Sequence, residues 1–322
     1  MKNHKNSEGI NNGNRAKKMN AIPVFPDFLP ISITMAKELH QFCSTIKSGV
    51  SEFTFANLYI DTLKYGYQVS RISEKTIVVC GISPFRMFEG HDLGGIFFFV
   101  LGDIPSANQL DELFARFRYW KNMPQDLFDK FSDQLFDKGF QIMEDRDNFD
   151  YLYLKTDLAA LQGKDFHKKK NLLNAFCSAY TAETKQLDIY SVADALSVLE
   201  SWKKTRNADD MADYAQCRLA LEQLETLGMG GIVAYADGVP VGFSLGETIC
   251  EGTMFVVVFE KGINSYKGVY QFVNRSQAIN LPGTVKIINR EQDLGNPGLR
   301  QAKMTYRPCG FTKKYLVLPT SI

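Results

Sequence analysis

The stretch that decides the fold spans residues 235–279 and reads YADGVPVGFSLGETICEGTMFVVVFEKGINSYKGVYQFVNRSQAI. Asp237-Gly238 lies between two apolar runs and predicts a tight hairpin, because this pair accepts the positive φ of a primed turn. Residues 253–259 form a nearly continuous apolar run, which is typical of a strand covered on both faces. Apolar residues then recur at helical spacing, so we expect a helix beginning near Lys267-Gly268.

A strand that leads through a loop into a helix N-terminus is suited to bind anions, because unpaired backbone N–H groups point outward there. We therefore predict a phosphate-binding loop at Tyr266, Lys267 and Gly268. The order of elements is also the central order of the GNAT acyltransferase fold, although GNAT phosphate loops usually carry more glycines. An ordinary mixed sheet with a covering helix fits these residues equally well.

The overall composition limits the number of domains, the class of protein and its possible partners. The 322 residues are enough for two domains, and 45% hydrophobic with 23% charged residues is typical of a soluble globular protein. A net charge of +1 gives no general attraction to nucleic acid or to anionic membranes. The six cysteines and four histidines have no metal-ligand spacing, so we expect a reducing, cytoplasmic location and no metal site.

The rest of the chain alternates strands and helices in two halves of similar order. Residues 1–20 are polar, lack the apolar segment of a signal peptide, and are expected to be a disordered tail. No apolar stretch reaches the length of a transmembrane helix. We place a domain boundary near residue 180, giving domains at 21–180 and 181–322. Strands are expected at 67–72, 76–82, 94–101, 140–143, 151–154, 187–190, 285–288 and 314–318, and helices at 33–46, 51–59, 108–120, 125–138, 163–180, 194–204 and 211–227.

The segment 288–308 concentrates charged and polar side chains directly after a predicted strand. If Pro297 begins a helix, these side chains form a wall that can hold a phosphate or carboxylate. A solvated helix with ion pairs is the alternative. The residues predicted to bind substrate or phosphate here are Asn289, Arg290, Asp293, Arg300 and Arg307.

Acid–base chemistry needs titratable groups beside such a wall. Glu260 ends the buried strand, and either Glu260 or Glu291 is a candidate general base if burial raises its pKa. For Glu260, a salt bridge between neighbouring surfaces is an equal alternative. Glu247, on the preceding strand, is a weaker rival. Lys303 and Tyr306 complete the predicted catalytic group, with Tyr306 as an acid.

A cluster of basic residues opens the helix predicted at 163–180. It can follow the phosphates of a nucleic acid or of lipids, or it can be a solvated helix face. The cluster consists of Lys164, His167, Lys168, Lys169 and Lys170. No GxSxG, Walker or complete Rossmann motif occurs in the sequence, so hydrolase, NTPase and dehydrogenase functions have no motif behind them.

Four segments together resemble the family of the C-terminal domain of phosphatidylglycerol lysyltransferase. They are SEFTFANLY (51–59), NFDYLYLKTDLAALQGKDFHKKKNLLNAF (148–176), VVVFEKGINSYKGVYQFVN (256–274) and NREQDLGNPGLRQAKMTYRP (289–308). The resemblance implies a mixed α/β fold of two GNAT-like domains in tandem, similar to the Fem-type transferases that use aminoacyl-tRNA. In the full lysyltransferase the acceptor is a lipid head group, but this sequence lacks the transmembrane region of that enzyme.

The leading hypothesis is therefore transfer of an aminoacyl group, with aminoacyl-tRNA as donor, to an amine or hydroxyl acceptor. The partners that it implies are tRNA and, at a membrane surface, anionic lipid. One alternative is an N-acyltransferase that uses a coenzyme A thioester such as acetyl-CoA. The other is a non-catalytic GNAT-like binding module.

Overall fold

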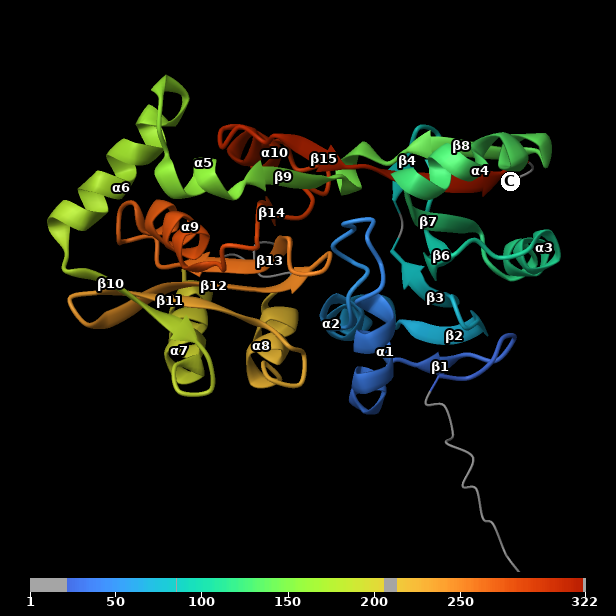
Figure 1. Cartoon of the computed structure of the whole chain (residues 1–322), viewed down its shortest axis with the longest axis horizontal. Coiled ribbons are helices and arrows are strands. Elements are labelled where there is room, and N and C mark those ends of the chain that lie inside the picture. Colours follow the sequence, from blue (N-terminus) through green and yellow to red (C-terminus); the bar gives the residue numbers. More distant parts are fainter. Residues whose placement is uncertain (1–21, 85, 206–212, 321–322) are drawn as a thin grey trace, which may run out of the picture.

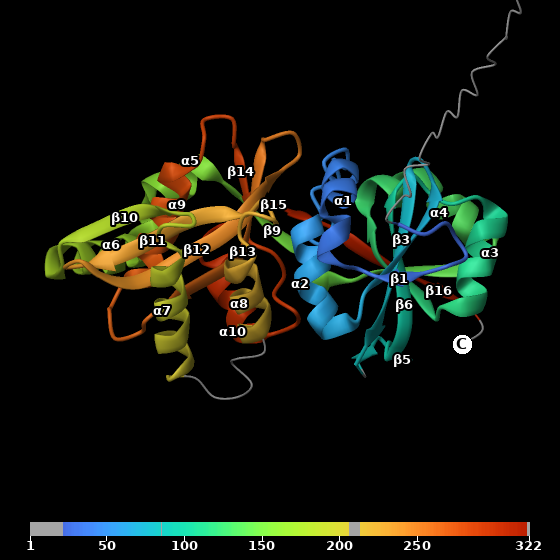
Figure 2. The same ribbon diagram turned by 90° about the horizontal axis from the view of Figure 1, so that it is seen from below.

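The computed structural model describes residues 22–84, 86–205 and 213–320, and these residues form a mixed α/β protein (Figure 1). The predicted tail at 1–20 lies outside the described residues. The described chain forms two seven-stranded sheets and one two-stranded sheet. Helices α1 and α2 lie between the two large sheets in both views (Figures 1 and 2).

Each large sheet draws strands from distant parts of the chain. The first, in spatial order, contains β1 (Leu29–Pro30), β2 (Gln68–Ser73), β3 (Thr76–Ser83), β6 (Gly95–Gly102), β7 (Tyr119–Pro124), β16 (Lys314–Pro319) and β8 (Phe140–Glu144). The second contains β10 (Ala182–Leu187), β11 (Gly230–Ala236), β12 (Val239–Ile249), β13 (Met254–Gly262), β14 (Ile287–Asn289), β9 (Asp150–Leu154) and β15 (Gly310–Thr312). The small sheet pairs β4 (Met87–Phe88) with β5 (His91–Asp92).

Helices surround these sheets. They are α1 (Ala36–Cys43), α2 (Phe55–Tyr65), α3 (Ala107–Arg116), α4 (Gln125–Asp137), α5 (Lys155–Ala160), α6 (His167–Ala179), α7 (Val192–Lys203), α8 (Tyr214–Glu222), α9 (Val269–Asn280) and α10 (Pro297–Met304). On the second sheet, α7 and α8 lie on one face and α5, α6 and α9 on the other (Figure 1). Both faces are therefore buried, as the apolar run at 253–259 predicted.

The hairpin predicted at Asp237-Gly238 joins β11 to β12. Both turn residues have positive φ, 49° at Asp237 and 80° at Gly238, which is the geometry that a type I′ turn requires. Helix α9 follows β13 and begins after Gly268, whose φ is 92°. The stretch quoted first thus folds as its pattern predicts.

The two halves repeat one order of strands. In the first, β3 and β6 are antiparallel, and after α3 the chain returns as β7, parallel to β6. In the second, β12 and β13 are antiparallel, and after α9 the chain returns as β14, parallel to β13. An antiparallel run followed by a helix and a parallel strand is the GNAT-like order predicted for both halves, so the fold class is confirmed.

The halves exchange strands, which the sequence did not predict. Strand β9 lies before residue 180 but is inserted between β14 and β15 in the second sheet. Strand β16 is near the C-terminus but is inserted between β7 and β8 in the first sheet (Figure 1). The predicted division at residue 180 therefore does not separate the strands of the two sheets. Since each sheet is completed by the other half, the halves are interlocked.

The helix predicted at 108–120 ends earlier, at Arg116, because residues 119–124 form β7. Tyr119 and Trp120 pair with Phe97 and Phe98 of β6, and this long-range pairing outweighs the local helical pattern. Similarly, the strand predicted at 187–190 is the earlier strand β10, which ends at Leu187.

Glu247 lies on β12 with one carboxyl oxygen, Oε1, buried and without a hydrogen-bond partner in the described structure. Burial raises the pKa of Glu247 to about 7 from 4.5.

The unfolded chain releases the proton of Glu247 at a lower pH than the folded chain does. The free energy of unfolding therefore falls as pH rises from about 4.5 to 7, and it stays lower above that range. We expect Glu247→Gln to raise the free energy of unfolding at pH 8 by about 2 kcal/mol and to change little at pH 4. Urea denaturation at both pH values tests this, and equal effects at the two would contradict it.

Candidate active site

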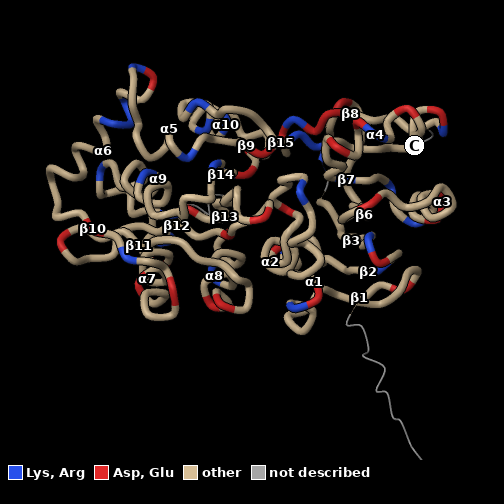
Figure 3. Tube along the Cα trace, viewed as in Figure 1, with Lys and Arg blue, Asp and Glu red and all other residues tan. Residues whose placement is uncertain are grey.

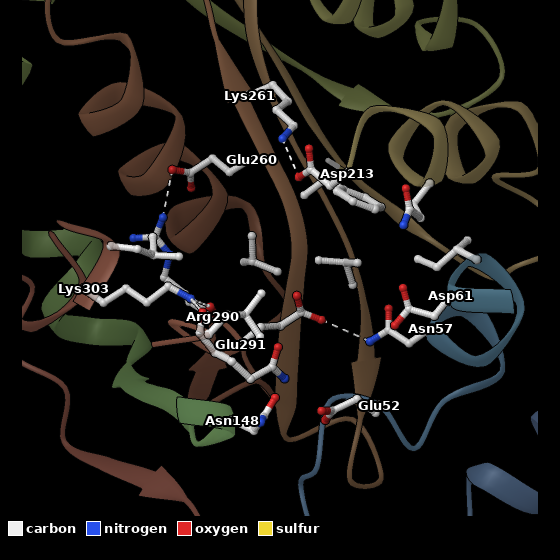
Figure 4. A pocket seen from close by; sticks show the side chains of 18 of the residues that line it. Glu52, Asn57, Asp61, Asn148, Asp213, Glu260, Lys261, Arg290, Glu291 and Lys303 are labelled. Carbon is white, nitrogen blue, oxygen red and sulfur yellow. Dashed lines mark hydrogen bonds and ion pairs between the residues drawn. The ribbon is translucent and has the colours of Figure 1, made fainter. Parts of the chain in front are cut away.

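A cavity of about 640 Å³ lies between the two halves (Figure 4). The first half contributes side chains from α2, from the loop before it and from β7. The second half contributes β13, α10 and the loop after β14. A cavity of this size between two halves is typical of a small-molecule site.

The cavity forms where β13 and β14 diverge. Their parallel pairing ends at Val256 and Asn289, so the edge of β13 beyond Val256 is not paired with β14. On the other side, the register with β12 shifts so that Val258 is an extra residue, which marks a β-bulge. Residues 257–261 of β13 line the cavity. Unpaired backbone N–H groups at such an edge can donate to a developing oxyanion.

Arg290 and Glu260 form an ion pair across this divergence. Nη2 of Arg290 donates to Oε1 of Glu260 at 2.8 Å, and both side chains are mostly buried (Figure 4). Glu260 Oε2 and Arg290 Nε are buried without partners in the described structure. The guanidinium carbon also lies 5.2 Å from the centre of the Tyr306 ring. The pair has no net charge, but it offers unsatisfied hydrogen-bonding capacity beside the cavity.

Glu291 follows directly and points into the cavity toward α2 (Figure 4). Its Oε1 accepts a hydrogen bond of 3.1 Å from Nδ2 of Asn57. Burial raises the pKa of Glu291 well above its usual range, and the negative charges of Asp150 and Glu52 raise it further. Its backbone φ is +54°, a strained value for a residue other than glycine. A carboxyl group with a raised pKa at a strained position is suited to acid–base chemistry.

Lys303, on α10, lies beneath the same loop. Its Nζ donates to the carbonyl oxygen of Arg290 at 2.6 Å and also to that of Gln292. Burial, with the nearby charge of Arg290, lowers the pKa of Lys303 to about 8. Lys303 therefore fixes the backbone on both sides of Glu291.

Tyr306 is buried beside this group, and its hydroxyl accepts a hydrogen bond of 3.4 Å from Nε2 of Gln271. Nζ of Lys169, from the basic start of α6, lies 4.2 Å from the centre of the Tyr306 ring. Burial and the charge of Arg290 lower the pKa of Lys169. The predicted basic cluster thus places one of its lysines in the cavity.

Asp150, the first residue of β9, holds these segments together. Its carboxylate accepts hydrogen bonds from the Ser51 backbone at 2.9 Å, from Asn289 at 3.1 Å and from Gln292 at 2.6 Å. Nζ of Lys314 donates to it at 2.7 Å, and the side chains of both Lys314 and Asp150 are completely buried. The exchanged strands β9 and β16 thus position the loop that carries Glu291.

The structure brings together Glu260, Arg290, Glu291, Lys303 and Tyr306, all predicted from the sequence, around the cavity. Asn289 lies beneath them, fully buried. Asp293 and Arg300 instead form a bidentate ion pair at 2.8 Å, joined by Tyr151 and Arg146, and they stabilise the turn before α10.

Other predicted residues lie outside the cavity lining. Arg307 pairs at 3.1 Å with Asp165, and both side chains are exposed. Tyr266 packs against Tyr180, and a Cβ atom at Gly268 would lie 2.1 Å from the carbonyl oxygen of Leu172, because α6 packs against the start of α9. Lys267 is exposed, as are Lys164, His167, Lys168 and Lys170 of the basic cluster. In Figure 3, basic segments (blue) appear in the loop between α5 and α6 and at the start of α6. Glu247 is likewise absent from the lining.

Sequence reasoning missed the contribution of the first half. Glu52, Asn57, Asp61 and Lys121 line the cavity from α2, its preceding loop and β7. Glu52 and Asn57 fall within the motif SEFTFANLY, which was the one available signal. Burial raises the pKa of Asp61 to about 6. Nothing in the spacing of these residues indicates that they face the distant segment that carries Glu291.

The fold and the cavity define a tandem GNAT-like protein whose candidate site is at the divergence of β13 and β14. Residues 44–318 match the family described as phosphatidylglycerol lysyltransferase, C-terminal, and the chain belongs to this family. In the described part of the chain, no helix combines the length and the apolar character needed to cross a bilayer.

Similar proteins support this fold. A conserved protein of unknown function from Bacteroides thetaiotaomicron superposes with a TM-score of 0.78 at 25% identity, covering 91% of this chain and 99% of that one. The structure of L-PGS from Bacillus licheniformis gives a TM-score of 0.56 at 12% identity, covering 89% and 92%. An uncharacterized protein of Mycoplasmoides gallisepticum is 28% identical over 178 residues, 52% of this chain. This match spans about half, 55%, of the length of that relative.

Proposed function

We propose that this protein transfers an aminoacyl group from aminoacyl-tRNA to an amine or hydroxyl acceptor, such as a lipid head group. The observation that carries the proposal is the convergence of Arg290, Glu260 and Glu291 at the unpaired edge of β13. Membership of the lysyltransferase C-terminal family supports the same class of reaction. The description of the family names phosphatidylglycerol, which suggests a lipid acceptor, and here that acceptor is part of the proposal.

The chemistry follows from the charges and the free edge. The acceptor oxygen or nitrogen attacks the carbonyl carbon of the aminoacyl ester, the new bond forms, and the bond to the ribose oxygen breaks. Glu291 takes the proton from the acceptor and returns it to the ribose oxygen. Backbone N–H groups of β13 stabilise the oxyanion, and Arg290 holds a phosphate or carboxylate. Tyr306 donates a hydrogen bond to the leaving ribose oxygen while Glu291 delivers the proton, and Lys303 keeps Glu291 in position.

The basic start of α6 supports tRNA as donor. Lys164, Lys168 and Lys170 are exposed, whereas Lys169 on the same segment lines the cavity. A charged surface that continues into the site can hold the tRNA backbone while its acylated end enters. This donor implies a reaction in the cytoplasm.

A coenzyme A donor is less well supported. The loop predicted to bind its phosphates packs against α6 at Gly268 and lies outside the cavity lining. A binding module without chemistry would not need a carboxyl group with a raised pKa at Glu291.

The test is transfer by the purified protein from a mixture of tRNAs charged with labelled amino acids. Total polar lipids and small amines serve as acceptors, and uncharged tRNA with labelled acetyl-CoA is the parallel arm. We expect labelled product only with charged tRNA. Product from acetyl-CoA alone would replace the proposal with a coenzyme A-dependent activity. Binding of charged tRNA without turnover would leave a binding module.

A further inference from the structure

A second, smaller cavity of about 170 Å³ adjoins the candidate active site. The two cavities share part of their lining and are therefore neighbouring compartments. The residues common to both are Lys64, Tyr65, Lys121, Asn148 and Leu294. The smaller compartment, which we call the side cavity, extends toward the first sheet.

The two compartments differ in charge. Among the described residues, the lining of the main cavity is of mixed charge. Its five carboxylates are Glu52, Asp61, Asp213, Glu260 and Glu291, and its six basic residues are Lys64, Lys121, Lys169, Lys261, Arg290 and Lys303. The described lining of the side cavity contains no carboxylate but includes Lys64, Arg86 and Lys121. An anion entering the main cavity meets fewer repulsive charges in the side cavity.

Two of these three cations are already engaged. Arg86 forms ion pairs with Asp145 at 2.9 Å and with Asp147 at 3.2 Å. Nζ of Lys64 lies 4.8 Å from the centre of the Tyr65 ring; burial lowers the pKa of Lys64, but a side-chain hydrogen bond with Tyr65 and the charge of Asp61 outweigh it and raise that pKa.

Lys121 differs from both. It exposes 9% of its surface, yet within the described chain its side chain forms no hydrogen bond and no ion pair. Its Nζ lies 5.1 Å from the centre of the Tyr65 ring and 5.3 Å from that of Phe97, which stabilise the cation only in part. Burial raises the pKa of Asp61, and the charge of Lys121 lowers it, without a hydrogen bond between the two side chains. The ammonium group itself is not sealed from the cavity space, so it can bind an anion there.

We propose that the side cavity binds an oxyanion, a phosphate or carboxylate, through Lys121, and that this anion belongs to the second substrate of the cavity. The assignment to a second substrate rests on the proposed function, whereas anion binding at Lys121 does not. Lys121 is on β7 of the first half and Glu291 is in the second, so the two halves would hold different parts of one substrate pair.

The test measures binding without any tRNA, so its failure is distinct from failure of the transfer reaction. Calorimetric titration with inorganic phosphate and glycerol 3-phosphate examines free phosphates. Co-sedimentation with vesicles of phosphatidylglycerol, compared with phosphatidylcholine, examines lipid head groups. The variants are Lys121→Met and Lys121→Gln, each checked for wild-type thermal unfolding. The matched control is Lys185→Met, because Lys185 also lies over a tyrosine ring, 4.6 Å from Tyr235, but outside the cavities.

We expect at least tenfold weaker binding by both Lys121 variants and unchanged binding by the Lys185 variant. If the Lys121 variants lose binding of the free phosphates, the ligand is a small phosphate ester. If it appears only with phosphatidylglycerol vesicles, the ligand is a lipid head group. The proposal is overturned if wild type binds none of these probes, or if it binds them equally well with and without Lys121.

Discussion

Replacing Glu291 with Gln is expected to reduce aminoacyl transfer at least ~100-fold, the usual effect of removing a general acid–base group. The amide keeps the size of the side chain and can still accept the hydrogen bond from Asn57. Because the folded protein raises the pKa of Glu291, its ionisation favours unfolding as pH rises. The Gln variant should therefore be at least as stable as wild type at neutral and higher pH. Single-turnover transfer and thermal unfolding, each measured from about pH 5 to about pH 9, separate the two effects.

The matched control is Glu251→Gln. Glu251 also has a positive φ, 55°, but its side chain is exposed and pairs with Lys47 away from the cavity. We expect this variant to transfer at the wild-type rate. A Glu291→Gln variant that retains full activity would remove Glu291 from the mechanism.

Replacing Lys314 with Met is expected to lower the free energy of unfolding by about 3–5 kcal/mol, because it leaves Asp150 as a buried charge without its cation. Glu52 also loses its partner at the cavity wall. Lys314 is the first residue of β16, and Asp150 is the first residue of β9. Loss of their ion pair therefore weakens the contact between the two strands that the halves exchange. Urea denaturation followed by both tryptophan fluorescence and circular dichroism measures it.

The neighbouring residue provides the control. Lys313 pairs with Glu144 at 2.7 Å on the surface, with both side chains partly exposed, so Lys313→Met should cost about 1 kcal/mol or less. Adding Asp150→Asn to Lys314→Met should recover part of the loss, because it removes the unpaired charge. Equal effects of the Lys313 and Lys314 variants would show that the buried pair does not hold the halves together.

The sequence by itself determined the local elements of the second half. Asp237-Gly238 dictates the hairpin because few pairs accept two positive φ values, and the apolar run at 253–259 requires cover on both faces. Pro297 predicted the start of α10, with Asn296 as its N-cap. The crowding of Arg290, Glu291 and Lys303 after a strand end predicted that this segment lines a site, because charges at a strand end lie at the edge of a sheet.

Only the tertiary structure decided which segments meet. The exchange of β9 and β16 depends on pairing between strands far apart in sequence, as for Leu152 with Asn289, and no local pattern encodes such a partner. The same long-range pairing brings α2 and β7 to the cavity, so Asn57 and Lys121 acquire their roles from position alone. Arg307 shows the converse: its sequence neighbourhood predicted a site residue, but the turn after α10 directs it to solvent. Side-chain chemistry can be predicted from sequence, whereas convergence on one cavity is a property of the folded backbone.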